Sequence, residues 1–369
     1  MSDRLRLLSQ AHGQSPWLDN LQRGFFASGT LDSLIERGVR GLTSNPTIFQ
    51  KAIQGSTDYD AQFNEETSKG LTPVEAYWEL VIADIHSALD SFSALHTATG
   101  GADGFVSVEV DPTLAHDGNG TLAAARALHE RINRPNVMIK IPATKEGLGP
   151  IRQMIAEGRN VNVTLIFSLD RHAEVMEAYI SGLEDRAAAG LPLAGVASVA
   201  SFFISRVDNE VDARLEATGT PAALALRGTA AVNQAKLAYD LFRVAFSGPR
   251  WEALAARGAQ VQRPLWASTS TKNPAYPDTL YVDSLIGPDT VNTLPDATLE
   301  AFADHGNPAR TIDTAVDSAR AQWAVLAEHG VDTVDVAAKL ERDGVASFIA
   351  SFDDLISALE TKAAALGRR

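Results

Sequence analysis

The stretch Asn136-Val-Met-Ile-Lys-Ile-Pro-Ala-Thr144 places a single lysine, Lys140, inside a run of apolar residues. Residues 137–141 predict a β-strand, and Pro142 ends it because proline has no backbone N–H to donate. An ammonium buried in such a strand costs on the order of several kcal/mol unless it is paired or neutral. That cost lowers the pKa of a lysine and exposes its nucleophilic amine. Lys140 is therefore a candidate Schiff-base former, with a solvent-facing lysine on a surface strand as the alternative.

Strands of this kind recur along the chain and are separated by helical stretches. Strands are predicted at residues 16–20, 39–46, 106–112, 137–141, 161–167, 196–203, 264–269 and 279–285. Helices are predicted at residues 122–132, 172–180 and 221–246, and Thr72-Pro73-Val74-Glu75 forms a capped helix start. Strands that alternate with helices form parallel sheets, and eight of them predict an α/β fold, the (β/α)8 TIM barrel.

The chain is predicted to form a single barrel domain over residues 1–369. Its 369 residues suit one large α/β domain or two ordinary ones, and no internal repeat or long linker divides them. Residues 334–340 and 347–366 have amphipathic helical patterns, so residues 330–369 are expected to be a C-terminal helical extension. This extension could pack on the barrel or form an oligomer surface, and the protein could be a monomer or a homodimer.

The composition is that of a soluble globular protein, with 45% hydrophobic and 21% charged residues. The net charge of -14 argues against nucleic acid or an anionic membrane as a general partner. Cysteine is absent, which excludes disulfides and thiolate chemistry. No apolar run reaches the roughly 18 residues of a membrane helix, and the first residues lack a signal-peptide pattern. We therefore expect a cytoplasmic protein.

Polar residues fall at or near the ends of the predicted strands. They are Asp19, Asn45, Glu109, Lys140, Thr164, Ser201 and Arg206, followed by Ser270 and Lys272. In a barrel these strand ends meet at one mouth, so the side chains would surround a single site. Structural roles are the alternative: Asp19 and Asn45 as loop caps, and Glu109 as an edge-strand charge. Thr164 could be an ordinary strand residue, and Arg206 a solvated residue that opens a helix. Their joint placement favours a functional site.

Common cofactor and metal motifs are absent from the sequence. There is no strand-G-x-G-x-x-G-helix dinucleotide fingerprint, no P-loop and no G-x-S-x-G nucleophile motif. The histidines show no H-E-x-x-H spacing, and His116 and His172 are predicted to be surface or helix residues rather than ligands. A site without cofactor or metal is therefore expected.

Five motifs, in order along the chain, resemble those of the transaldolases. They are Gly41-Leu-Thr-Ser-Asn-Pro-Thr-Ile-Phe49, Val108-Glu-Val-Asp111, Val137-Met-Ile-Lys-Ile-Pro-Ala-Thr144, Asn162-Val-Thr-Leu-Ile-Phe-Ser168 and Ser201-Phe-Phe-Ile-Ser-Arg206. The resemblance runs from about Asp19 to Leu285, and the C-terminal extension is similar to that of the longer bacterial form. It places the chain in the class that includes the Schiff-base class I aldolases.

The resemblance implies a cofactor-free transferase of the pentose phosphate pathway. It would move a dihydroxyacetone unit from sedoheptulose 7-phosphate to glyceraldehyde 3-phosphate, which gives erythrose 4-phosphate and fructose 6-phosphate. Lys140 would form the Schiff base, and Asp19 would take and return the proton of carbon–carbon cleavage. Glu109 and Thr164 would position a catalytic water, with Glu109 assisting proton transfer. Phosphorylated sugars are the implied partners.

Further positions would bind the substrate by the same resemblance: Asn45, Ser201, Arg206, Ser270 and Lys272. Asn45 would donate to substrate hydroxyls, and Arg206 would bind the phosphate through its planar, bidentate guanidinium. Many relatives carry a second arginine where this chain has Lys272, which binds phosphate only as a point charge.

Two rival functions share parts of this pattern. A Schiff-base aldolase that releases dihydroxyacetone to water, or cleaves fructose 6-phosphate, would also use Lys140. Small aldolases of that kind lack this length and often replace the acid on the third strand, so Glu109 and the 369 residues favour the transferase. A non-catalytic sugar-phosphate-binding barrel is disfavoured because Lys140, Asp19 and Glu109 are all present.

Overall fold

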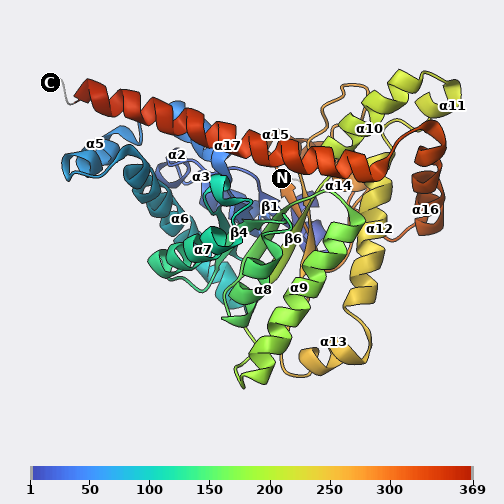
Figure 1. Ribbon diagram of the computed structural model, residues 1–369, viewed down its shortest axis with the longest axis horizontal. Coiled ribbons are helices and arrows are strands. Elements are labelled where there is room, and N and C mark those ends of the chain that lie inside the picture. Colours follow the sequence, from blue (N-terminus) through green and yellow to red (C-terminus); the bar gives the residue numbers. More distant parts are fainter. Residues whose placement is uncertain (1–2, 367–369) are drawn as a thin grey trace.

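Eight parallel strands close into a barrel in the computed structural model, which describes residues 3–366 (Figure 1). The strands are β1 (Gln14–Leu18), β2 (Gly41–Thr43), β3 (Phe105–Glu109), β4 (Val137–Pro142), β5 (Val161–Ile166), β6 (Ser198–Phe203), β7 (Arg263–Ala267) and β8 (Thr290–Leu294). They follow one another around the barrel in chain order, and β8 pairs with β1. The predicted (β/α)8 fold is confirmed.

Helices surround the barrel and cover its outer face (Figure 1). Before and between the strands lie α1 (Arg4–His12), α2 (Gly24–Ala27), α3 (Thr30–Arg37), α4 (Pro46–Gln54), α5 (Asp60–Ser68), α6 (Pro73–Ala98), η1 (Pro112–Leu114), α7 (Gly118–Ile132), α8 (Leu148–Ala156), α9 (Leu169–Ala188), α10 (Ser205–Thr218), α11 (Pro221–Leu224), α12 (Ala230–Ala245), α13 (Gly248–Ala255) and α14 (Leu280–Asp283). The last strand is followed by α15 (Asp296–His305), α16 (Val316–Val325), η2 (Leu326–His329) and α17 (Thr333–Leu366).

The strands are buried on both faces because helices cover the outside and side chains fill the inside. Every residue of β4 is buried, which explains its nearly continuous apolar sequence. Trp17 is fully buried and packs against Gly41, where a Cβ atom would lie 2.5 Å from the indole ring. Only glycine fits at this position of β2.

The start of α6 has the capping geometry that its sequence predicts. The Thr72 Oγ1 accepts a hydrogen bond from the Glu75 N–H at 3.3 Å, and the Glu75 carboxylate accepts one from the Thr72 N–H at 2.8 Å. These two bonds satisfy backbone donors that the first turn of a helix leaves free.

The predicted eighth strand at residues 279–285 is wrong. This segment contains the short helix α14, and the eighth strand of the barrel is β8. The Leu285 carbonyl accepts hydrogen bonds from the Gln14 and Trp266 side chains, not from a neighbouring strand. Because β8 buries Asn292 and two threonines, Thr290 and Thr293, it lacks the apolar pattern that the other strands show.

The single helical region predicted at residues 221–246 is interrupted. It consists of α11 and α12, and backbone N–H groups of the intervening loop and of the first turn of α12 donate to two carboxylates of α10. Asp212 accepts from the Gly228 N–H at 2.9 Å, and Asp208 accepts from the Ala231 N–H at 2.7 Å. These long-range bonds give hydrogen-bond acceptors to backbone N–H groups that have none within a helix.

The C-terminal extension packs on the barrel as one continuous helix rather than two. Figure 1 shows α17 crossing above the strands, and it contacts α4, α6, α10 and β5. Residues 367–369 of the predicted extension lie outside the described residues. The division of the chain into a single domain stays a prediction.

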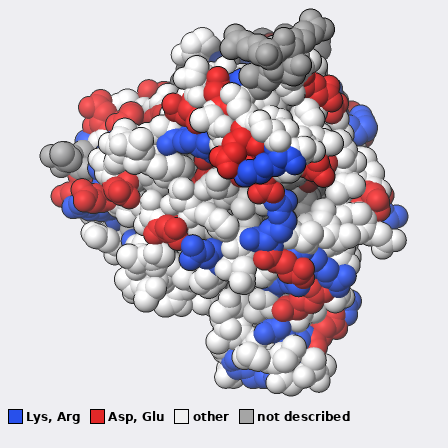
Figure 2. Space-filling model, turned by 90° about the vertical axis from the view of Figure 1, so that its left-hand side faces the viewer, with Lys and Arg blue, Asp and Glu red and all other residues white. Residues whose placement is uncertain are grey.

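Acidic and basic side chains lie interspersed on the face that Figure 2 shows. Ion pairs also join neighbouring helices of the molecule, including Arg152 of α8 with Asp185 of α9 at 2.6 Å and Arg131 of α7 with Glu79 of α6 at 2.7 Å. Within residues 3–366, no helix has both the length and the apolar character needed to cross a membrane.

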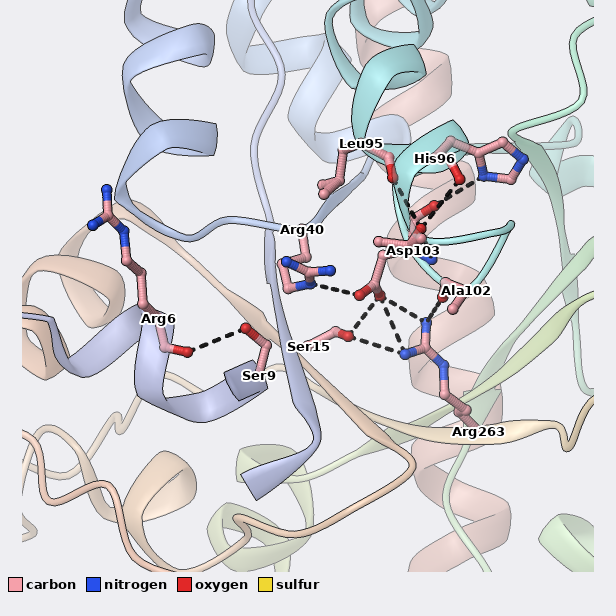
Figure 3. Close-up of polar contacts among 10 residues, drawn as sticks. Arg6, Ser9, Ser15, Arg40, Leu95, His96, Ala102, Asp103 and Arg263 are labelled. Atoms are coloured by element: carbon pink, nitrogen blue, oxygen red, sulfur yellow. Dashed lines mark hydrogen bonds and ion pairs between the residues drawn. The ribbon is translucent and has the colours of Figure 1, made fainter. Parts of the chain in front are cut away.

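A buried carboxylate ties the N-terminal ends of the strands together (Figure 3). Asp103 accepts hydrogen bonds from Ser15 Oγ at 2.6 Å, Arg40 Nε at 2.5 Å and Arg263 at 3.2 Å. These residues belong to or precede β1, β2, β3 and β7. Because this end lies opposite the C-terminal mouth, we interpret the network as structural.

Candidate active site

A cavity of about 360 Å³ lies at the C-terminal ends of the strands. Of the site residues predicted from the sequence, those that line it are Asp19, Asn45, Lys140, Thr164, Ser201, Arg206, Ser270 and Lys272. The remaining one, Glu109, contacts Lys140 from the neighbouring strand. The barrel therefore brings together residues that are more than 250 positions apart in the sequence.

Lys140 is buried, with 4% of its surface exposed, so the alternative of a solvent-facing lysine is wrong. Its Nζ donates a hydrogen bond to the Ser44 carbonyl at 3.2 Å and lies 3.2 Å from Glu109 Oε2. The register of β3 and β4 pairs Glu109 directly with Lys140. This pairing offsets part of the cost of removing both groups from water.

Glu109 and Thr164 carry buried oxygens that are available for further partners. Burial raises the pKa of Glu109, and the nearby Lys140 offsets only part of that rise. The contact with Lys140 has an ion-pair distance without hydrogen-bond geometry, so both Glu109 oxygens lack a hydrogen-bond partner among the described residues. Thr164 Oγ1 also lacks one. Because buried polar groups need partners, these atoms can accept a substrate hydroxyl or a water.

A short chain of hydrogen bonds runs through Asn162, the residue that pairs in register with Lys140. Ser201 Oγ donates to Asn162 Oδ1 at 2.7 Å, and Asn162 Nδ2 donates to Ser107 Oγ at 3.0 Å. These bonds cross from β6 through β5 to β3 inside the barrel. Asn162 and Thr164 are two residues apart on β5, which puts them on one face of the strand. This alternation ends after Thr164, because Leu165 has a φ of 60° and the β5–β6 register shifts there.

Asp19 directly follows β1 and faces the cavity. Its backbone N–H donates to the Leu294 carbonyl at 2.9 Å, which extends the β1–β8 pairing by one residue. Burial raises the pKa of the Asp19 carboxyl, and the positive charge of Lys140 opposes this rise. A carboxyl group with a raised pKa can hold a proton and release it closer to neutral pH, as a general acid–base catalyst requires.

Asn45 has both a structural and a cavity-facing part. Its Oδ1 accepts a hydrogen bond from the Ile48 N–H at 3.0 Å and so caps the start of α4. The capping role suggested as an alternative is therefore correct for the oxygen. Because the oxygen is the capping atom, the amide Nδ2 remains as a donor for the cavity that Asn45 lines.

Three cations line the cavity without a carboxylate ion-pair partner in the described part of the chain: Arg206, Lys272 and Lys51. The Arg206 guanidinium lies 5.3 Å from the centroid of the Phe203 ring, and burial lowers the pKa of Arg206. Lys272 Nζ donates to Ser270 Oγ at 2.6 Å. In a protein of net charge -14, unpaired cations around one cavity indicate a site for an anion.

Sequence reasoning missed several residues of the cavity wall. The polar and charged ones are Thr43, Thr47, Lys51, Ser268, Thr293 and Ser347, and Phe348 adds an aromatic ring. Thr47 and Lys51 are four positions apart after the helix start at Pro46, so helical spacing could have placed them on one face. No local signal could have identified Ser347 or Phe348, because α17 reaches the cavity only through tertiary packing.

A larger cavity of about 500 Å³ lies between α9, α12, α16 and α17. None of the site residues predicted from the sequence lines it, and its Arg171 pairs with Glu174 at 2.8 Å. Within residues 3–366 no group of three or more histidine, aspartate or glutamate residues could hold a metal ion. The two histidines were predicted to be surface or helix residues. His172 is buried in a helix, and His116 is exposed. The chemistry therefore points to the barrel mouth.

Comparison with known proteins agrees with this geometry. The family model described as transaldolase/fructose-6-phosphate aldolase matches residues 16–359. A transaldolase of Parafrankia sp. (strain EAN1pec) is 53% identical over 361 residues, which cover 97% of this chain and 98% of the relative. A transaldolase of Frankia alni is 50% identical and covers 100% of this chain and 99% of the relative. Transaldolase 1 of Streptomyces coelicolor is 50% identical over 94% of this chain and 92% of the relative.

Proposed function

The chain belongs to the transaldolase/fructose-6-phosphate aldolase family, and we propose that it works as a transaldolase through a Schiff base on Lys140. The observation that carries this proposal is the buried Lys140, which lines a cavity with Asp19 and forms an ion pair with Glu109 of the neighbouring strand. A carbon–carbon bond next to a carbonyl needs an electron sink to break. A protonated imine supplies that sink without a cofactor.

In the first half of the reaction, the Lys140 amine attacks the C2 carbonyl of sedoheptulose 7-phosphate. The carbinolamine loses water to give a protonated imine, and Glu109 assists these proton transfers together with a water that Thr164 helps to position. The Asp19 carboxylate then accepts the proton of the C4 hydroxyl. The C3–C4 bond breaks, its electrons move to the imine, and erythrose 4-phosphate leaves.

In the second half, a three-carbon enamine remains bound to Lys140. It attacks the aldehyde carbon of glyceraldehyde 3-phosphate, and Asp19 returns its proton to the new hydroxyl. Water adds to the resulting imine, the C–N bond breaks, and fructose 6-phosphate leaves with the lysine restored. Asn45 Nδ2 and Ser201 are proposed to contact the hydroxyls of the bound sugar, because both residues line the cavity.

The phosphate of the sugar would bind among Arg206, Ser270 and Lys272 at the cavity mouth. Arg206 offers two parallel N–H donors, whereas Lys272 offers a point charge that Ser270 orients. We include Lys51 as a further cation for this phosphate, because it lines the same cavity and has no carboxylate partner within residues 3–366. We also propose a cytoplasmic role in the pentose phosphate pathway, where these sugar phosphates are exchanged.

Borohydride trapping with fructose 6-phosphate tests the mechanism. Reduction should fix a three-carbon adduct on the enzyme, and peptide mass mapping should place it on Lys140. The Lys140→Ala variant should give no adduct. Lys145→Ala is the matched control, because Lys145 is an exposed lysine five residues away and its loss should leave the adduct unchanged.

The type of reaction is tested by adding erythrose 4-phosphate together with fructose 6-phosphate. A transaldolase forms sedoheptulose 7-phosphate, whereas an aldolase releases free dihydroxyacetone. An adduct on another lysine, or none on a folded wild-type protein, would contradict the Schiff-base mechanism.

A further inference from the structure

We propose that Phe348 of α17 is a specificity-determining residue that keeps water away from the enamine on Lys140 and so directs the three-carbon unit to an aldose. This inference rests on the proposed function and goes beyond it. It gives the C-terminal helix, which lies outside the barrel, a part in choosing between transfer and hydrolysis.

Phe348 forms a wall of the cavity next to the reacting nitrogen. The centroid of its ring lies 5.8 Å from Lys140 Nζ, and the residue is 4% exposed. The adjacent Ser347 also lines the cavity. Lys140 is thus covered from above by a helix that begins almost 200 residues after it in the sequence. The Phe348 side chain has no nitrogen or oxygen atom that could hold a water molecule by a hydrogen bond.

Phe352 extends the apolar cover to the partner of Lys140. It lies four residues after Phe348 and therefore on the same face of α17. Together with Tyr77 it lines a narrow space beside Glu109, and the two rings are 5.5 Å apart in an edge-to-face arrangement. Phe348 and Phe352 consequently shield both members of the Lys140–Glu109 pair from solvent.

The position of α17 over the barrel is fixed by contacts on both sides of Phe348. Before it, Gly344 packs so closely on β5 that a Cβ atom would lie 3.0 Å from the Leu165 side chain. After it, Ser351 Oγ lies 2.8 Å from Thr47 Oγ1 in α4 and shares a hydrogen bond with it. The Phe348 ring is therefore held in place over Lys140 by packing and hydrogen bonding to two different elements of the barrel mouth.

The enamine has two possible fates after the first product leaves. In transfer, its nucleophilic carbon attacks the aldehyde of the acceptor. In hydrolysis, the same carbon takes a proton, the resulting imine takes up water, and the C–N bond breaks to give dihydroxyacetone and free Lys140. An apolar ring over Lys140 disfavours the second course because it keeps bulk water from reaching and protonating the enamine carbon, while the water that Thr164 helps to position is retained for the imine steps.

The partition between these fates can be measured directly. Each enzyme is given fructose 6-phosphate with erythrose 4-phosphate, and the dihydroxyacetone released is divided by the sedoheptulose 7-phosphate formed. Phe348→Ala should raise this ratio by about tenfold or more, since it opens the wall to water. Phe348→Leu keeps most of the apolar volume and should stay within about threefold of the wild type. Val334→Ala, at an exposed site of the same helix, is the control and should leave the ratio unchanged.

A ratio unaltered in Phe348→Ala would overturn the inference. Both products arise from one intermediate, so a variant that is partly unfolded makes less of each and leaves the ratio as it was. If Phe348→Ala does not fold, the Leu variant and Phe348→Val supply a graded series, and a ratio independent of side-chain volume would refute the proposal. Failure of the proposed function is recognised separately, by a wild type that forms neither a Lys140 adduct nor sedoheptulose 7-phosphate.

Discussion

Glu109 Oε2 lies 3.2 Å from Lys140 Nζ because β3 and β4 pair these two residues in register. Both side chains are buried, with 5% of Glu109 and 4% of Lys140 exposed. Each charge is therefore stabilised mainly by the other, and removing one leaves the other unpaired in an apolar setting.

Replacing Lys140 by Met should make stability depend on pH. At about pH 8 the unpaired Glu109 carboxylate should lower the free energy of unfolding by about 3–5 kcal/mol relative to the wild type. Burial already raises the pKa of Glu109, and without Lys140 the pKa should rise further. A raised folded-state pKa means stability that is present at low pH and lost as the pH increases. Urea denaturation at about pH 5 and pH 8 measures this difference.

The double variant Lys140→Met with Glu109→Gln is the matched control. It has no buried charge at this position, so its stability relative to the wild type should vary much less between the two pH values. Equal pH dependence in the single and double variants would argue against Glu109 as the source.

Asp19→Asn should block carbon–carbon cleavage while leaving imine formation in place. The amide cannot accept the proton of the substrate hydroxyl, so kcat should fall by about 10²–10⁴. Borohydride with fructose 6-phosphate should then trap a six-carbon adduct on Lys140 in place of the three-carbon one. Asp32→Asn, which removes an exposed carboxylate from α3, should behave as the wild type. A three-carbon adduct at the normal rate would exclude Asp19 as the base.

The unpaired cations should act on the phosphate of the substrate. Arg206→Met is expected to raise KM for fructose 6-phosphate by roughly 10–100-fold, because a charge-assisted hydrogen bond is lost. Lys272→Met and Lys51→Met should have smaller effects, since both side chains are exposed point charges. None of the three changes should alter kcat/KM for unphosphorylated fructose. Equal losses with both sugars would indicate a structural role instead.

Asp103→Asn should destabilise the barrel without changing its chemistry. The substitution weakens an acceptor of hydrogen bonds from Ser15, Arg40 and Arg263, so we expect a loss of about 3–5 kcal/mol in the free energy of unfolding. The kcat per folded molecule should stay the same because the network lies at the opposite end of the strands. Glu300→Gln breaks the exposed pair with Arg37 and should cost less than about 1 kcal/mol. Chemical denaturation of both variants makes the comparison.

The buried carboxyl of Asp208 should lower the free energy of unfolding as the pH rises. Burial raises the pKa of its carboxyl to about 6 from an ordinary 3.8, although Tyr281 Oη and the Ala231 N–H donate to it. The folded protein thus binds more protons than the unfolded chain between these values, so stability present below about pH 4 is lost as the pH rises through 6. The loss amounts to about 3 kcal/mol.

Asp208→Asn removes this titration. The free energy of unfolding of the variant minus that of the wild type should therefore become more positive by about 3 kcal/mol as the pH rises from about 4 to 7. Measuring both proteins across that range cancels the contributions of the other carboxylates. A difference independent of pH would show that Asp208 titrates normally in the folded protein.

Local patterns were sufficient for most of the barrel. The strand around Lys140 is buried on both faces, so its apolar run identifies it directly, and the strand-end position of Asp19 and Thr164 follows from the same reasoning. The eighth strand was placed wrongly because β8 buries threonines and Asn292, whose polarity conceals it from any hydropathy pattern. The segment that was predicted as a strand, 279–285, contains a turn of helix at 280–283, and its Leu285 carbonyl accepts hydrogen bonds from side chains of β1 and β7 instead of a strand neighbour.

Residue types and their order along the chain were enough to determine the fold class and to single out the lysine of the proposed site, because alternation and burial are properties of neighbouring residues. Tertiary structure alone decided which groups meet. The 3.2 Å contact between Lys140 and Glu109 requires the register of two strands, and the Phe348 ring above Lys140 requires α17 to cross the barrel mouth. Such contacts join residues far apart in sequence, and they form only when the closed barrel and its covering helices bring those residues to one place.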